Sequence, residues 1–172
     1  DLEFSTVLRQ VSDHCVTVLG NEKALQIAPF SSKEALLINL QLTNEYLSSL
    51  HNDNRIPNHG FDAITKEMQL LRIENTYLEV GSLKKIVSIA ITTNDIVSFL
   101  KKFEIYYKNL NEFASEIEIT KVIIEKVDAV VDRFGEIKDN ASPLLFELRQ
   151  SLNKVKGKIN QSFASALNLY HG

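Results

Sequence analysis

The longest hydrophobic pattern in the sequence runs through its last 30 residues. Apolar side chains recur there at steps of three and four, the spacing of one face of an α-helix. The members of this stripe are Leu145, Leu148, Leu152, Val155, Ile159, Phe163, Ala166 and Tyr170. Pro143 suits the first turn of the helix, and Asn140 or Ser142 can cap it. At about 1.5 Å per residue the helix would be roughly 40 Å long, which is more than a compact domain of this size covers easily. The narrow stripe is typical of a coiled-coil seam, so we expect a partner helix.

A turn with β-capable flanks precedes this helix. Residues 133–135 lie between Val130-Val131 on one side and Ile137-Lys138 on the other. Gly135, at the third place, suits the positive φ that a three-residue hairpin loop needs. The pattern therefore predicts one short β-hairpin that leads into the long helix.

Further helical patterns fill the chain ahead of the hairpin. The predicted helices cover residues 4–15, 17–27, 33–50, 61–71, 82–102, 106–116 and 120–128. The run Thr92-Thr93-Asn94 marks a point where the fifth of them can bend or break. We thus predict an all-α protein with a multi-helix core domain over residues 1–142, one short β-hairpin, and a long protruding helix over residues 143–172.

The composition is that of an ordinary soluble chain. Its 172 residues are 44% hydrophobic and 24% charged, and no apolar run approaches the roughly 20 residues that a membrane span requires. No secretory leader is visible. The single cysteine, Cys15, excludes an internal disulfide and a cysteine zinc cage. These features favour a cytoplasmic protein without a membrane partner.

Charge changes this picture only near the end of the chain. The net charge is −3, which does not indicate a nucleic-acid binder. After Glu147, however, the chain carries only basic charges, at Arg149, Lys154, Lys156 and Lys158. These residues either solvate the exposed face of a helix or contact a phosphate backbone. We favour the first interpretation, because four spread charges form a weak footprint.

The sequence offers few residues for catalysis or cofactor binding. Gly157-Lys158 lacks the upstream glycine and the hydroxyl residue of a P-loop, so we expect no nucleotide site within these residues. A further group, His51, Asp53, His59 and Asp62, has the ligand types of a metal site. A solvated turn explains this group better, because no helix holds the two histidines at ligand spacing. We predict no catalytic, cofactor-binding or metal-binding residue.

An aromatic group invites one more hypothesis. Phe99, Phe103, Tyr106 and Tyr107 lie near three lysines and could stack nucleic-acid bases. A helical core with lysines at its edge explains them more simply.

The turn and the start of the last helix resemble a known signature. The run Phe134–Pro143, FGEIKDNASP, followed by Leu145, Leu148 and Arg149, is similar to a motif of bacterial MutS-like proteins. The resemblance is to the second bacterial branch, whose members typically end in a Smr nuclease domain. It extends through Leu2-Glu3-Phe4, Gly20, Pro29, Ile56-Pro57, Phe61-Asp62 and Tyr77-Leu78-Glu79. It thus covers essentially the whole chain, but only the front portion of the family's length.

This resemblance implies a non-catalytic segment of a DNA-processing ATPase. The chain would be the core domain and the ascending half of the lever, a long antiparallel helical pair that couples the ATPase state to a DNA clamp. Gly135, Asn140 and Pro143 would form the hinge. The seam for the partner helix would be Leu148, Leu152, Val155, Ile159 and Phe163. The segments that bind ATP and Mg, and the nuclease, would lie beyond Gly172, so this chain would not be an enzyme by itself.

The resemblance also implies partners. They are the return lever helix, the clamp and the ATPase domain of the same chain, a second copy in a homodimer, and DNA or the ribosome. The family is linked to restraining recombination and to acting on stalled ribosomes. An alternative that the unpaired stripe supports equally well is a stand-alone helical module that binds a partner helix. A nucleic-acid binder that acts alone is a third possibility, and it predicts binding that falls steeply with salt.

Overall fold

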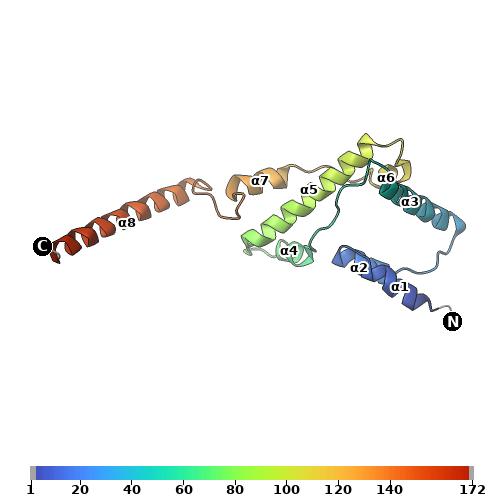
Figure 1. Cartoon of the computed structure of the whole chain (residues 1–172), viewed down its shortest axis with the longest axis horizontal. Coiled ribbons are helices and arrows are strands. Elements are labelled where there is room, and N and C mark those ends of the chain that lie inside the picture. The colour runs from blue at the N-terminus through green and yellow to red at the C-terminus, as the bar shows by residue number, and fades with distance from the viewer. Residues whose placement is uncertain (1–2, 171–172) are drawn as a thin grey trace. The chain divides into compact units, whose positions relative to one another are not determined.

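The computed structural model describes residues 3–170, with side chains up to Leu167, and this part of the chain forms eight α-helices (Figure 1). Their bounds are α1 Phe4–Asp13, α2 Val18–Leu25, α3 Lys33–His51, α4 Thr65–Leu70, α5 Val80–Lys102, α6 Lys108–Phe113, α7 Val122–Val130 and α8 Pro143–Tyr170. Contacts divide the chain into two compact units, Asp1–Ile124 and Glu125–Gly172. The all-α prediction is confirmed, whereas the predicted boundary at residue 142 stays a prediction.

The helices α1 and α2 form a tightly packed pair. The two helices are in contact, and each has one buried residue, Ser12 on α1 and Ala24 on α2, which are 4% and 5% exposed. The Asn21 amide donates to the carbonyl of Ser12 at 3.2 Å. Thr17 caps α2, because its side chain accepts the N–H of Gly20 at 3.0 Å.

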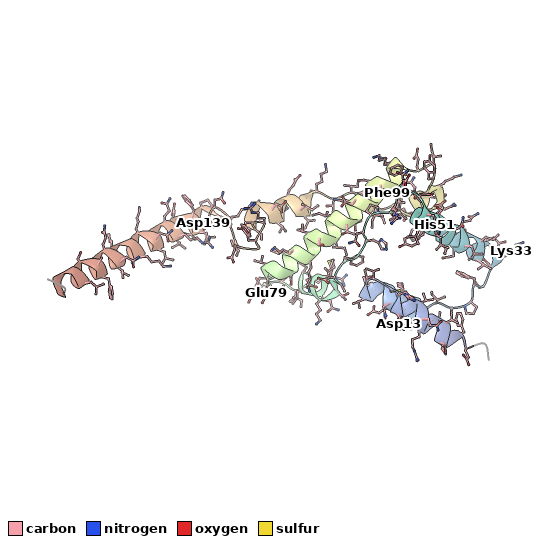
Figure 2. The ribbon with its side chains drawn as sticks, in the orientation of Figure 1. Asp13, Lys33, His51, Glu79, Phe99 and Asp139 are labelled. Carbon is pink, nitrogen blue, oxygen red and sulfur yellow. The ribbon has the colours of Figure 1, made fainter. Side chains whose placement is uncertain are left out.

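The main core of the first unit lies where α5 meets α6. Leu100, Tyr107 and Ala114 are buried there, and Ile96, Phe99, Phe103 and Leu110 pack around them. Phe99 lies near the C-terminal end of α5, next to α6 (Figure 2), and its ring centroid is 5.5 Å from that of Tyr107. The core interpretation of the aromatic group is thus confirmed for Phe99, Phe103 and Tyr107. It is wrong for Tyr106, which is 65% exposed.

Helix α3 is joined to this core by one carboxylate. Glu45 accepts the backbone N–H groups of Asn109 and Leu110, both at 2.9 Å, and the side-chain amide of Asn109 at 2.6 Å. The first N–H groups of a helix have no partner within the helix. Glu45 therefore acts as an N-terminal cap for α6 that is supplied by a different helix.

A second carboxylate, Glu67, joins α4 to α5. It is 7% exposed, accepts the Ser82 hydroxyl at 3.3 Å and lies 3.8 Å from the Lys85 ammonium. Its backbone hydrogen bond, with smaller contributions from Lys85 and Ser82, lowers the pKa of the Glu67 carboxyl from 4.5, while burial opposes this shift. A lowered pKa means that this stabilisation is present at neutral pH and is lost as the pH falls below 4.5 and through the folded-state pKa.

Two expectations about the middle of the chain are wrong. The helix predicted from residue 61 begins only at Thr65, because residues 61–64 continue the extended connection from α3. Helix α5 runs through residues 92–94 without a break. Asn94 donates its amide to the carbonyl of Thr120 at 2.7 Å and accepts the N–H of Thr120 at 3.0 Å. Its side chain thus bonds a distant segment instead of disrupting its own helix.

The predicted β-hairpin is wrong, because residues 3–170 contain no strand. Helix α7 continues through Val130, which leaves one antiparallel bridge, between Val131 and Ile137. The loop inside this bridge is closed by Asp132, whose carboxylate accepts the N–H groups of Phe134 and Glu136, both at 2.9 Å. A side chain that satisfies the local backbone in this way favours a turn over a sheet ladder.

Few apolar side chains are buried in the described part of the chain. The buried ones are Ala24, Ala90, Leu100, Tyr107, Ala114, Val127 and Val131. Leucine, isoleucine, valine and phenylalanine side chains are instead exposed along most helices, including α1, α3 and α8. Within residues 3–170 no helix is both long and apolar enough to cross a membrane. Large uncovered apolar surface on a helical protein is typical of surfaces that contact another protein segment.

Candidate functional site

The strongest candidate site is the apolar stripe of α8, and every predicted seam residue is exposed. The exposed fractions are 58% for Leu148, 53% for Leu152, 54% for Val155, 58% for Ile159 and 68% for Phe163. Their steps of three and four place them on one face of the 28-residue helix. Figure 2 shows the side chains along α8. Tyr170, the last member of the predicted stripe, lies outside the described side chains.

The four basic residues of α8 do not form one patch. Lys154 and Lys158 are four residues apart and share one side of the helix, whereas Arg149 and Lys156 are seven apart and share another. The Arg149 guanidinium is already engaged, because it forms an ion pair with Asp139. Phosphate contact by these residues stays a prediction.

The segment that joins α7 to α8, residues 131–142, is called the connector here, and it is closed by its own hydrogen bonds. The N–H of Lys138 donates to the carbonyl of Val130 at 2.9 Å, and the N–H of Asp132 donates to that of Glu136 at 2.9 Å. Gly135 has φ of 89°, so the expected positive φ is confirmed. Among the two candidate caps it is Ser142 that accepts the N–H of Leu145, at 3.2 Å. The hinge role of Gly135, Asn140 and Pro143 stays a prediction.

Replacing Gly135 by alanine is expected to open the connector. At its φ of 89° a Cβ atom adds roughly 1–2 kcal/mol of strain. Hydrogen exchange at the Lys138 amide, which is bonded across the bridge, should therefore speed up about tenfold. An exchange rate equal to that of the unmodified chain would contradict a strained backbone at residue 135.

The same substitution at Gly157 should stabilise the protein, in contrast to its effect at Gly135. It lies in the middle of α8, and a Cβ atom there would meet nothing within 4 Å. Gly157→Ala should stabilise α8 by about 1 kcal/mol, because glycine costs more backbone entropy than alanine in a helix interior. Circular dichroism at 222 nm should show more helix and a higher melting temperature. Gly81→Ala, at the start of α5 with the same open space, should change helicity less.

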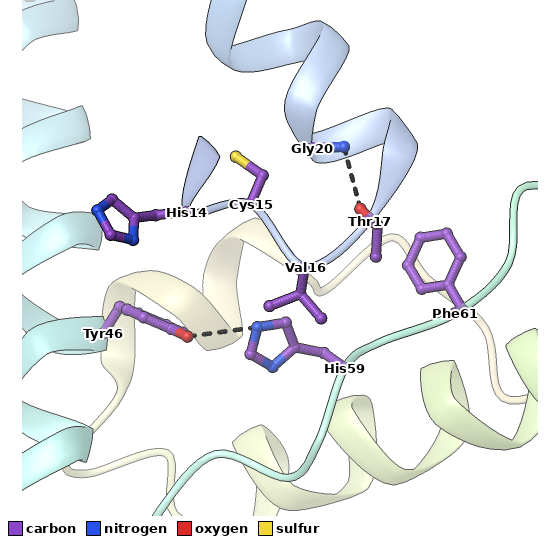
Figure 3. Close-up of a pocket in the computed structure, with 8 residues that line it drawn as sticks. All are labelled: His14, Cys15, Val16, Thr17, Gly20, Tyr46, His59 and Phe61. Atoms are coloured by element: carbon purple, nitrogen blue, oxygen red, sulfur yellow. Dashed lines mark hydrogen bonds between the residues drawn. The ribbon is translucent and has the colours of Figure 1, made fainter. Parts of the chain in front are cut away.

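A second candidate is a cavity of about 350 Å³ beside the turn between α1 and α2 (Figure 3). His14, Cys15, Val16 and Thr17 line it from the turn, and Tyr46, His59 and Phe61 line it from α3 and the connection that follows. Val16 lies close to Gly60, where an added Cβ would come within 3.2 Å of its Cγ1 atom. The turn therefore packs closely on the backbone near residue 60.

Both ring nitrogens of His59 have hydrogen-bond partners within the protein, so the position of this side chain does not require a ligand. One ring nitrogen lies 3.3 Å from the Tyr46 hydroxyl (Figure 3). The other lies 3.1 Å from the carbonyl of Pro57. Cys15 donates its thiol to the carbonyl of Val11 at 3.4 Å. Within residues 3–170 no three His, Cys, Asp or Glu side chains converge as metal ligands. His59, one of the four residues with the ligand types of a metal site, therefore contacts Tyr46 and Pro57.

Sequence reasoning missed Glu45 and the pairing of Arg149 with Asp139. No local signal identifies Glu45, because its partners on α6 lie 64 and 65 residues further along the chain. Arg149 and Asp139 are ten residues apart. An acid shortly before a helix and a base two turns into it is a pattern that could have indicated this pair.

Comparison with known proteins bears on the similarity noted from the sequence. No family model matches the chain. A protein named Endonuclease MutS2 from Alkaliphilus oremlandii is 27% identical over 173 residues, which cover 97% of this chain and 22% of that protein. Proteins of the same name from Lactobacillus johnsonii and Staphylococcus epidermidis are 23% and 25% identical, over 88% and 94% of this chain. The chain spans about a fifth of the length of these curated relatives. The predicted resemblance is thus confirmed, because the chain is similar over most of its length to a segment of proteins named Endonuclease MutS2.

Proposed function

We propose that this chain is a non-catalytic core and lever segment of a MutS-like DNA-processing protein. In this proposal α8 is the ascending half of the lever, and its stripe packs on a return helix. The segment then couples the state of an ATPase domain, which binds ATP and Mg, to a clamp on DNA. The longer protein would also carry the endonuclease activity for which its relatives are named.

The observation that carries the proposal is the uncovered stripe of α8. An isolated helix is marginally stable in water unless its apolar face is packed against a partner. The seam residues are all more than half exposed, and they extend over four turns of a helix that begins at Pro143. Similarity over nearly the whole chain, but over only about a fifth of the MutS2 proteins, supports the view that further segments supply this partner.

The size of the native polypeptide tests the proposal directly. An antibody raised against this segment should detect, in cell extract, a species several times larger than 19.5 kDa. Mass spectrometry of that species should find a P-loop peptide in the same polypeptide. A species near 19.5 kDa would instead support the alternative, a stand-alone helical module that binds a partner helix.

In the 172-residue chain itself, the stripe should cause self-association, and Ile159→Asp should weaken it. Burying an isoleucine contributes about 1.5–3 kcal/mol. A symmetric dimer loses this contribution twice, so its dissociation constant should rise about 100-fold or more. Sedimentation equilibrium measures this change. Hydrogen exchange in α5 and α6 should not change, because Ile159 lies in the other compact unit.

Asn160→Asp is the matched control. It adds the same charge one residue further along α8, where the side chain is exposed and lies off the apolar stripe. Its dissociation constant should stay close to that of the unmodified chain. Equal effects of the two variants would refute the stripe as the contact surface.

A further inference from the structure

The connector and the start of α8 contain a charged contact that the proposed function does not explain. Arg149 lies two turns into α8, and its Nη1 atom donates to the carbonyl of Ile137 at 3.0 Å. The same atom forms an ion pair and a hydrogen bond with the carboxylate of Asp139. One guanidinium of the helix thus bonds both the backbone and a side chain of the connector.

The connector is in turn bonded to the end of α7. The N–H of Lys138 donates to the carbonyl of Val130 at 2.9 Å, and its ammonium donates to the carbonyl of Asp128. The bridge between Val131 and Ile137 lies in the same place. Ile137 therefore belongs to a segment that is already held to α7, and Arg149 extends this hold to α8.

We propose that Arg149 is an electrostatic clasp that sets the direction in which α8 leaves the connector. With the clasp closed, the guanidinium spans the turn at residues 139–142 and restrains the pivoting of α8 there. With the clasp open, α8 stays helical, because Ser142 still accepts the N–H of Leu145, but its direction is no longer defined.

A modest rise in ionic strength is enough to weaken the ion pair of the clasp. The side chains of Arg149 and Asp139 are 39% and 72% exposed, so the pair is in contact with solvent. An exposed ion pair contributes about 0.2–1 kcal/mol, and added salt screens it. The neutral hydrogen bond to Ile137 survives in salt but uses the same Nη1 atom. The clasp is therefore a device in which ionic strength or a competing anion changes the freedom of α8.

Distance measurement between two spin labels tests this proposal. In a Cys15→Ser background, labels at Lys126→Cys on α7 and Ser162→Cys on α8 report the direction of α8 by pulsed electron resonance. Both positions are exposed and belong to the same compact unit. The experiment is done with dilute labelled chain in excess unlabelled chain, so that only distances within one chain are recorded.

The unmodified clasp should give one dominant narrow distance at low salt. Asp139→Asn removes the ion pair but leaves the hydrogen bond to Ile137, so it should broaden the distribution measurably. Arg149→Gln removes both contacts of the guanidinium and should broaden the distribution further, and circular dichroism should show unchanged helix in both variants. Salt at 1 M should broaden the distribution of the unmodified clasp only. Glu147→Gln, which removes the same charge as Asp139→Asn from an exposed position on α8, should leave the narrow distance in place. A narrow distance that survives in Asp139→Asn, or an equal broadening in Glu147→Gln, would overturn the proposal.

Discussion

Tyr107→Ala is expected to lower the free energy of unfolding of the first unit by about 4–6 kcal/mol. Removing a large buried aromatic side chain costs about 3–5 kcal/mol, and its lost hydrogen bond adds about 1 kcal/mol. Tyr107 is fully buried, and its hydroxyl donates to the carbonyl of Asn54 at 2.6 Å. Leu100 and Ala114 are the other buried members of its core, so few contacts remain to compensate. Urea unfolding followed by circular dichroism measures the loss.

The neighbouring tyrosine provides the control. Tyr106 is 65% exposed, and Tyr106→Ala should change the free energy of unfolding by no more than about 0.5 kcal/mol. Tyr107→Phe keeps the ring and removes only the hydroxyl, so it should cost about 1 kcal/mol. Equal destabilisation by the two alanine variants would show that the buried position of Tyr107 is wrong.

Glu45→Ala is expected to have the next largest effect, about 2–4 kcal/mol, because it leaves the N–H groups at the start of α6 without their acceptor. Hydrogen bonds to a charged group contribute about 1.5–3 kcal/mol each, and they are not independent. The Asn109 and Leu110 amides, which both donate to Glu45, should lose their protection from hydrogen exchange. Exchange in α1 and α2 should stay unchanged.

Two further substitutions distinguish the hydrogen bonds of Glu45 to α6 from the general effect of its negative charge. Glu45→Asp keeps the charge but shortens the side chain by one methylene, so it should lose most of the protection at both amides. Glu34→Gln removes an exposed acid from the first turn of the same helix and should cost no more than about 1 kcal/mol. If Glu45→Asp kept full protection, general electrostatic attraction between α3 and α6 would explain the contact instead of a specific cap.

The sequence by itself determined the helical class and the approximate position of every helix. Hydrophobic periodicity and caps are local properties, so they can be recognised without knowledge of the fold. Ser142 accepts the N–H of Leu145 as a cap, and Gly135 takes the positive φ that its turn requires. The apolar stripe of α8 was likewise visible as spacing alone. Local reasoning was wrong at Val130, where the helical pattern of α7 prevails over β propensity.

Only the tertiary structure decided which side chains hold these helices together. Tyr106 and Tyr107 are adjacent and chemically identical, yet only Tyr107 is buried, because α5 and α6 meet on one side of the turn between them. Glu45 was one of 22 acidic residues in the sequence until α6 placed two N–H groups beside it. The pairing of Arg149 with Asp139 depends on how the chain turns at residues 139–142. Each of these contacts joins residues that are separated along the chain, and the energy of such a contact depends on the distance and geometry that folding imposes.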